Sequence, residues 1–166
     1  IGESSSQNIA IIIISTDQFK LIDESKGHKT SEILLKLIAT RLNETVNHEK
    51  SKIARLETDV FIITYSRFKH AEEVKNYALG IELAFKEPFI VHQEKTILTL
   101  NMGIAMYPVD GSDAKTLIHH ANLALGHAKT LEDNIQFFIQ SLPDLATKQI
   151  AMETDLKRAL IDNQFV

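Results

Sequence analysis

The sequence has no cysteine and no tryptophan, and only three prolines and six glycines. The absence of cysteine excludes disulfide bonds and thiolate metal sites, and it allows a reducing compartment. The longest apolar run, residues 9–14, is far shorter than the roughly 20 residues that cross a bilayer, and residues 1–7 do not resemble a signal peptide. A formal net charge of -4 gives no reason to expect contact with nucleic acid or a membrane. We therefore expect a cytoplasmic protein.

The composition that remains is that of an ordinary globular protein, with 44% hydrophobic and 24% charged residues. A chain of this length buries roughly 70% of its unfolded surface as a single domain. Residues 1–8 are polar and serine-rich, which predicts a flexible lead-in. Residues 9–140 are expected to form the domain, and residues 141–166 a helix that follows it.

Several extended runs have the composition of β-strands. Residues 9–14 and 60–65 are apolar almost throughout, which predicts strands buried on both faces, the first of them central. The turn of the predicted hairpin, residues 57–59, carries charge and a β-branched Thr58 where tight turns favour glycine or asparagine. The expected strands are residues 9–14, 53–56, 60–65, 89–92, 96–106 and 135–139.

Apolar residues at helical spacing predict the segments between these strands. Asp17 is placed to cap the first helix, which stops near Gly27, and Asp113 is placed to cap the fourth. Hairpins that alternate with helical crossovers predict an α/β fold with a mixed sheet. The expected helices are residues 17–24, about 34–46, 74–85, 113–128 and 141–162.

Two blocks in the second half resemble the GGDEF domain, the catalytic domain of diguanylate cyclases, which make cyclic di-GMP from two GTP. Residues 101–114 read Asn-Met-Gly-Ile-Ala-Met-Tyr-Pro-Val-Asp-Gly-Ser-Asp-Ala, similar to the family's Ser-x-Gly-Ile-Ala-x-Tyr-Pro-x-Asp-Gly-x-Asp. Residues 121–129 read Ala-Asn-Leu-Ala-Leu-Gly-His-Ala-Lys, similar to Ala-Asp-x-Ala-Leu-Tyr-x-Ala-Lys. The resemblance implies a mixed central sheet of about five strands wrapped by helices, as in nucleotidyl cyclases and polymerase palms.

The signature hairpin departs from the family, which makes residues 9–140 resemble a degenerate GGDEF domain. The family writes Arg-x-Gly-Gly-Asp/Glu-Glu-Phe, whereas residues 55–61 read Arg-Leu-Glu-Thr-Asp-Val-Phe. The resemblance makes Asp59 the surviving metal ligand and Ser15 the replacement of the other, and it puts Val60 where a group would activate the attacking 3′-hydroxyl. One carboxylate holds Mg²⁺ at most weakly, and valine accepts no proton, so catalysis is not expected. The degenerate signature comprises Glu57, Thr58, Asp59, Val60 and Phe61.

The resemblance also assigns nucleotide contacts. The family's guanine-contacting Asn and Asp correspond to Asp23 and Glu32, and two phosphate-contacting positions correspond to Lys20 and Lys129. Asp23 does not donate as an amide does, and Asp133 stands where the family has an arginine. We expect weak GTP binding at most, no required cofactor, and no product-inhibition site, because residues 48–51 read His-Glu-Lys-Ser instead of Arg-x-x-Asp.

Residues 150–160 resemble the helix that leads into an EAL phosphodiesterase domain. The first hypothesis is therefore an inactive GGDEF domain that regulates or dimerises an adjacent EAL domain, with residues 141–166 as the linker and a homodimer implied by the family. The second is a sensor that binds GTP without turnover. The third is an active cyclase with rearranged ligands.

Each candidate residue also has a plain structural explanation. Asp17 can be a helix cap and Asp59 a turn former. Lys20 and Lys129 can be solvated surface lysines. Zinc binding by some of the seven histidines is not expected, because the sequence has no i, i+4 histidine pair with a carboxylate.

Overall fold

The computed structural model describes residues 7–16, 18–131 and 133–139. The predicted C-terminal helix and most of the predicted lead-in lie outside these ranges. Within them, no helix is both long enough and apolar enough to span a membrane. The elements are β1 (Ile9–Thr16), α2 (Phe19–Lys26), α3 (His28–Thr45), β2 (Ser51–Glu57), β3 (Val60–Ser66), α4 (Ala71–Ala84), β4 (Phe89–Val91), β5 (Glu94–Thr96), β6 (Leu100–Tyr107), α5 (Ala114–Leu131) and β7 (Ile135–Phe137).

The main sheet has five strands with β1 at its centre. The strand order is β2-β3-β1-β6-β7, with β1 antiparallel to both β3 and β6, and β7 parallel to β6. Residues 10–14 of β1 are buried, as expected of a strand with helices on both faces. The predicted α/β fold, its mixed five-stranded sheet and its central buried strand are confirmed.

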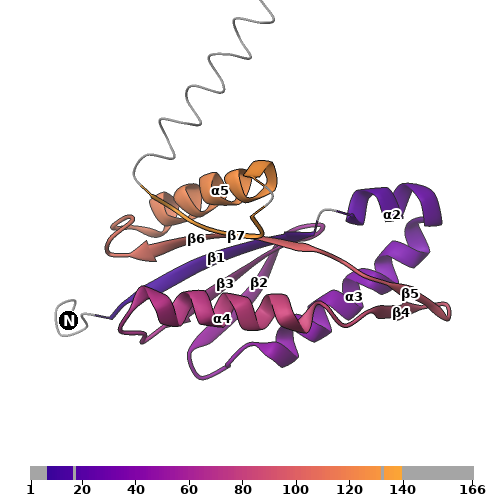
Figure 1. The fold of residues 1–166 in the computed structure, drawn as a ribbon, viewed down its shortest axis with the longest axis horizontal. Coiled ribbons are helices and arrows are strands. Elements are labelled where there is room, and N and C mark those ends of the chain that lie inside the picture. The colour runs from indigo at the N-terminus through magenta and orange to yellow at the C-terminus, as the bar shows by residue number, and fades with distance from the viewer. Residues whose placement is uncertain (1–6, 17, 132, 140–166) are drawn as a thin grey trace, which may run out of the picture.

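Helices cover both faces of this sheet (Figure 1). The larger hydrophobic cluster joins the sheet to α3 and α4, and a smaller one joins β1 and β6 to α5. At Gly103 the α5 backbone comes so close that a Cβ atom would lie 2.1 Å from the carbonyl oxygen of Ala121. β6 therefore needs glycine at this position for α5 to pack on the sheet.

Strand β3 is buried on one face only, so the prediction that residues 60–65 are buried on both faces is wrong. Phe61, Ile63 and Tyr65 are buried, whereas the residues between them are half-buried. The reason is that α5 packs mainly over β1, β6 and β7, so Val60 and Ile62 of β3 contact the α5 cluster but stay partly exposed. Residues 60–65 are apolar on both faces of the strand, so their composition did not show that the face towards α5 is only partly covered.

Residues 89–96 form a separate two-stranded hairpin, whereas the prediction was a strand pair of residues 89–92 and 96–106 joined by residues 93–95. β4 and β5 pair with each other in a two-stranded sheet and are joined by His92 and Gln93, both with positive φ (52° and 68°). Two-residue hairpin turns with positive φ at both positions usually carry Asn-Gly or similar residues. Because this turn carries neither, residues 89–92 and 96–106 were predicted as two runs joined by a loop.

The helix ends agree in part with the prediction. The helix stop at Gly27 is confirmed, and α2 begins at Phe19 after Gln18, which makes no side-chain cap. Asp17 lies outside the described residues. Asp113 caps α5, because its Oδ1 accepts a hydrogen bond from the Thr116 N–H at 2.8 Å, and this bond holds the pKa of Asp113 below its usual value.

Candidate functional site

The position that the resemblance assigns to a lost metal ligand lies in the middle of the sheet. Ser15, on β1, is paired with Val60 on β3 and with Asn101 on β6. Residues directly opposite each other on neighbouring strands share one face of a sheet. Ser15 and Asn101 are 3% and 2% exposed, and Val60 is half-buried. This row of three neutral side chains offers no carboxylate to a divalent cation.

The signature hairpin closes with a two-residue turn, Thr58-Asp59, and not with the predicted three-residue turn. Glu57 belongs to β2 and pairs with Val60, and the register shifts between Arg55 and Glu57, as at a β-bulge. Among the described residues, positive φ is confined to positions 27, 67, 92 and 93. The hairpin therefore has no need of glycine, because the extra residue of the bulge changes the strand geometry before the turn.

Asp59 is the one carboxylate of the turn itself, and it contacts the end of β1. The hydroxyl of Thr16 donates a hydrogen bond of 3.3 Å to Asp59 Oδ2. No three Asp, Glu or His side chains come together in a metal-binding arrangement within the described parts of the chain. The geometry supports the turn-forming interpretation of Asp59, and its assignment as a vestigial metal ligand stays a prediction.

The two predicted guanine-contacting residues lie on neighbouring helices around one imidazole. His28 Nδ1 lies 3.5 Å from Asp23 Oδ1, and His28 Nε2 lies 3.7 Å from Glu32 Oε1. The Ser31 hydroxyl donates a hydrogen bond of 2.5 Å to the same Asp23 oxygen. No role was predicted for Ser31, although it is 1% exposed and its hydroxyl orients the Asp23 carboxylate. A guanine base that binds here would compete with the His28 imidazole for the carboxylates of Asp23 and Glu32.

The two predicted phosphate-contacting lysines are exposed on separate helices. Lys20 lies in the first turn of α2 and Lys129 in the last turn of α5. A lysine near a helix C-terminus interacts favourably with the helix dipole, which is a structural role for Lys129 without any ligand. Their assignment as phosphate contacts stays a prediction.

The residues at the expected product-inhibition position are part of a polar contact between β2 and α4. Ser51 is 4% exposed, and its hydroxyl lies 2.6 Å from the Tyr77 hydroxyl, which also accepts a hydrogen bond from the Asn47 N–H at 3.3 Å. Tyr77 in turn stacks on Tyr65, with ring centroids 4.1 Å apart. Ser51 therefore faces the protein interior, where a ligand-binding acid would have to face solvent.

The histidines considered for zinc have other surroundings. His120 stacks on Phe138, with ring centroids 4.0 Å apart, and its Nδ1 lies 2.6 Å from the Asp110 carbonyl oxygen. His127, on α5, is 7% exposed, a burial that the sequence did not predict. Helical spacing alone gave no signal for it, because His127 lies beside the predicted apolar stripe.

A family model described as diguanylate cyclase, GGDEF domain, matches residues 2–134. The chain belongs to the GGDEF family. Curated GGDEF relatives include the cyclic di-GMP phosphodiesterase NbdA of Pseudomonas aeruginosa, 30% identical over 95% of this chain and 20% of the relative. They also include the bifunctional diguanylate cyclase/cyclic di-GMP phosphodiesterase MucR of the same species, 28% identical over 96% and 23%. The chain thus spans about a fifth to a quarter of these relatives.

Solved GGDEF structures show the same fold. The GGDEF domain of TpbB (YfiN) from Pseudomonas aeruginosa superposes with a TM-score of 0.83, at 23% identity, over 88% of this chain and 86% of that one. An EAL/GGDEF domain protein from M. capsulatus gives a TM-score of 0.74 at 28% identity, over 80% and 85%. The relatives' names include cyclases, phosphodiesterases and bifunctional proteins, so function has to be argued from the residues of this chain.

Proposed function

We propose that this GGDEF domain is catalytically inactive and regulates an attached EAL phosphodiesterase domain in cyclic di-GMP signalling. The observation that carries the proposal is the neutral row of Ser15, Val60 and Asn101 across the three central strands. At Ser15 and Val60 the family resemblance expects carboxylates, and Asn101, which stands where the family motif has serine, adds none. The scaffold is that of the family, and the groups that would perform the reaction are absent from that row.

Nucleotidyl transfer depends on metal ions that bridge the phosphates and neutralise the developing charge. Mg²⁺ dehydrates reluctantly and is normally bound through carboxylates together with substrate phosphates. Here Asp59 is a lone carboxylate, and Ser15 is neutral and buried. Val60 replaces the residue that would accept the proton, a loss that typically costs about 10²- to 10⁴-fold in rate. Loss of a metal site lowers the rate further.

The hairpin also changes the charge that a triphosphate would meet. Glu57 and Thr58 stand where the family has two glycines, and both side chains are exposed. Glycines allow a backbone to approach a phosphate closely. A glutamate there adds like charge and bulk, which supports weak GTP binding at most and no tightly held Mg²⁺.

The EAL partner is supported by the relatives. The chain spans 20% of NbdA and 25% of the Escherichia coli phosphodiesterase PdeR, so most of each relative lies beyond the matched region. Residues 150–160, which resemble the helix that leads into an EAL domain, fall outside the described residues. An adjacent EAL domain, a homodimer and a cytoplasmic location are parts of this proposal.

The test is a cyclase assay. We expect the 166-residue chain, incubated with GTP and either Mg²⁺ or Mn²⁺, to form no cyclic di-GMP by liquid chromatography with mass detection. The matched variant Asp59→Ala should behave identically, and an active GGDEF domain serves as the positive control. Product that forms with the unmodified chain and disappears with Asp59→Ala would show an active cyclase with rearranged ligands and would overturn the proposal.

The second candidate is a sensor that binds GTP without turnover. The placement of Asp23 and Glu32 next to the two ring nitrogens of His28 favours it. Two carboxylates can still accept hydrogen bonds from the N–H groups of a guanine edge. Calorimetric titration with GTP distinguishes the candidates, with Glu32→Gln as the matched variant. Heat at millimolar GTP that Glu32→Gln abolishes supports the sensor, and no heat removes it.

A further inference from the structure

Helix α2 buries the fewest residues of the described helices. Of its eight residues only Phe19 is buried, whereas α3 has five buried residues, α4 has three and α5 has six. Isolated helices of this length are marginal in water, so a short helix depends on its tertiary contacts. The position of α2 is therefore set by Phe19 and the partly buried Ile22, by the Asp23–Ser31 hydrogen bond to α3, and by polar contacts at its ends.

The C-terminal end of α2 meets α3 at a single residue. Gly27 has φ 96° and ψ 162°, a backbone conformation that is essentially restricted to glycine. Its N–H donates to the Asp23 carbonyl, and its own carbonyl accepts from the Ser31 N–H. A Cβ atom at this position would meet nothing within 4 Å. The junction is thus a one-residue hinge with open space around it.

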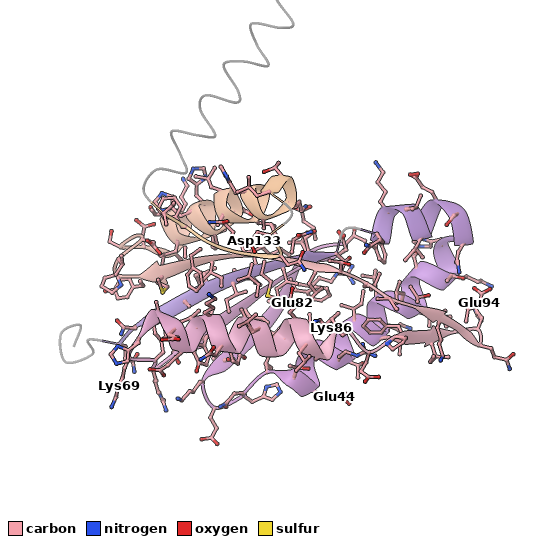
Figure 2. All side chains as sticks on the ribbon, in the orientation of Figure 1. Glu44, Lys69, Glu82, Lys86, Glu94 and Asp133 are labelled. Atoms are coloured by element: carbon pink, nitrogen blue, oxygen red, sulfur yellow. The ribbon has the colours of Figure 1, made fainter. Side chains whose placement is uncertain are left out.

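Both ends of α2 are attached to one segment of the chain, residues 94–99. Lys26 Nζ lies 2.7 Å from Glu94 Oε1 on β5, and the Thr99 N–H donates a hydrogen bond of 3.1 Å to the Gln18 side chain. The Lys26 hydrogen bond lowers the pKa of the Glu94 carboxyl, as expected for a carboxylate that accepts a bond from a cation. The β4–β5 hairpin lies at the same end of the molecule as α2, and Glu94 lies on the hairpin (Figures 1 and 2).

We propose that α2 is hinged at Gly27 and that the Lys26–Glu94 ion pair helps to hold its C-terminal end against the domain, so that the β4–β5 hairpin biases its position. Opening would separate Lys20 and Asp23, on α2, from Glu32, on α3. Loss of the Lys26–Glu94 contact would thereby rearrange the predicted nucleotide contacts. The device follows from packing and tethers alone and holds whether or not nucleotide binds.

The experiment is hydrogen exchange with mass detection on the 166-residue chain at neutral pH. Exposed ion pairs contribute little, and Lys26 and Glu94 are 43% and 66% exposed. Glu94→Gln should therefore speed exchange of the α2 amides by about two- to fivefold. Exchange in α4 and α5 should stay unchanged. Lys95→Gln, one residue along the same strand, is the matched control and should have no effect on α2.

Two further measurements separate the tether from general destabilisation. The charge-reversed double variant Lys26→Glu/Glu94→Lys should restore slow exchange in α2. Salt at about 1 M, where the Debye length is about 3 Å, should reproduce the effect of Glu94→Gln in the unmodified chain. Unchanged α2 exchange in Glu94→Gln, or an equal acceleration in α2, α4 and α5, would overturn the proposal.

Discussion

The β6–α5 unit and the signature hairpin both pack against β1. The glycine of β6 is required for packing within the chain, whereas the family glycines of the hairpin serve the approach of a ligand. In β6, Gly103 leaves room for the backbone of α5 within the same chain. In the hairpin, the places of two family glycines are taken by exposed Glu57 and Thr58, neither of which has positive φ. A glycine that makes room for a helix cannot change without displacing that helix. A glycine that makes room for a ligand can change wherever the ligand is no longer bound.

The largest expected effect tests the first half of this comparison. Gly103→Ala should destabilise the domain by about 3 kcal/mol, because its Cβ would meet backbone atoms of Ala121 and Leu125 that cannot rotate away. Urea denaturation measures the change. The matched variant Gly126→Ala, on exposed α5 surface with nothing within 4 Å, should stabilise by about 0.5–1 kcal/mol. Equal effects of the two variants would contradict the close approach.

A smaller effect is expected at the start of α5, and it depends on pH. Asp113→Ala removes the cap on Thr116 and should lower the Tm by about 3 °C at pH 7. The folded-state pKa of Asp113 is lower than its unfolded value of 3.8, so its stabilisation is present above that value and is lost as the pH falls through the folded pKa. The Tm difference between the two proteins should therefore shrink below about pH 4. A difference that stays constant to pH 2 would show that the carboxylate charge is not involved.

The smallest effect is expected in the signature hairpin. Glu57→Ala/Thr58→Ala should change the free energy of unfolding by no more than about 0.5 kcal/mol, because both side chains are exposed. The same urea titration that measures Gly103→Ala measures this variant. A loss comparable to that of Gly103→Ala would mean that the hairpin side chains have acquired a packing role, and the contrast between the two regions would fail.

The elements that could be predicted are those with strong periodicity or a specific cap. The apolar run of β1, the stop at Gly27 and the cap at Asp113 each have a local physical cause that is visible in the sequence. The turn and the bounds of the β4–β5 hairpin could not be found this way, because His92 and Gln93 are not typical of its turn. The partial exposure of one face of β3 depends on where α5 packs on the sheet, which is a tertiary property.

The site was predictable only where the family resemblance supplied positions. Ser15, Val60 and Asp59 could be aligned from the motif, but their burial could not. The contact of His28 with Glu32 is an i, i+4 pair within α3, which helical spacing does give. The Ser31–Asp23 hydrogen bond and the His28–Asp23 contact join α3 to α2, and no spacing rule gives them, because they depend on the angle between two helices joined at Gly27.

The strand pairing has a mechanical consequence for any longer polypeptide that carries this domain. β1 enters the sheet opposite Tyr107, and β7 leaves it alongside the same half of β6, which alone separates them. β1 and β7 are thus two strand spacings apart, roughly 10 Å across the sheet, and the end of β7 lies three residues, roughly another 10 Å, along β6 from the start of β1. A force or rotation applied to the chain before β1 would be transmitted to the chain after β7 through β6 alone. The helices and the other strands would lie outside this path.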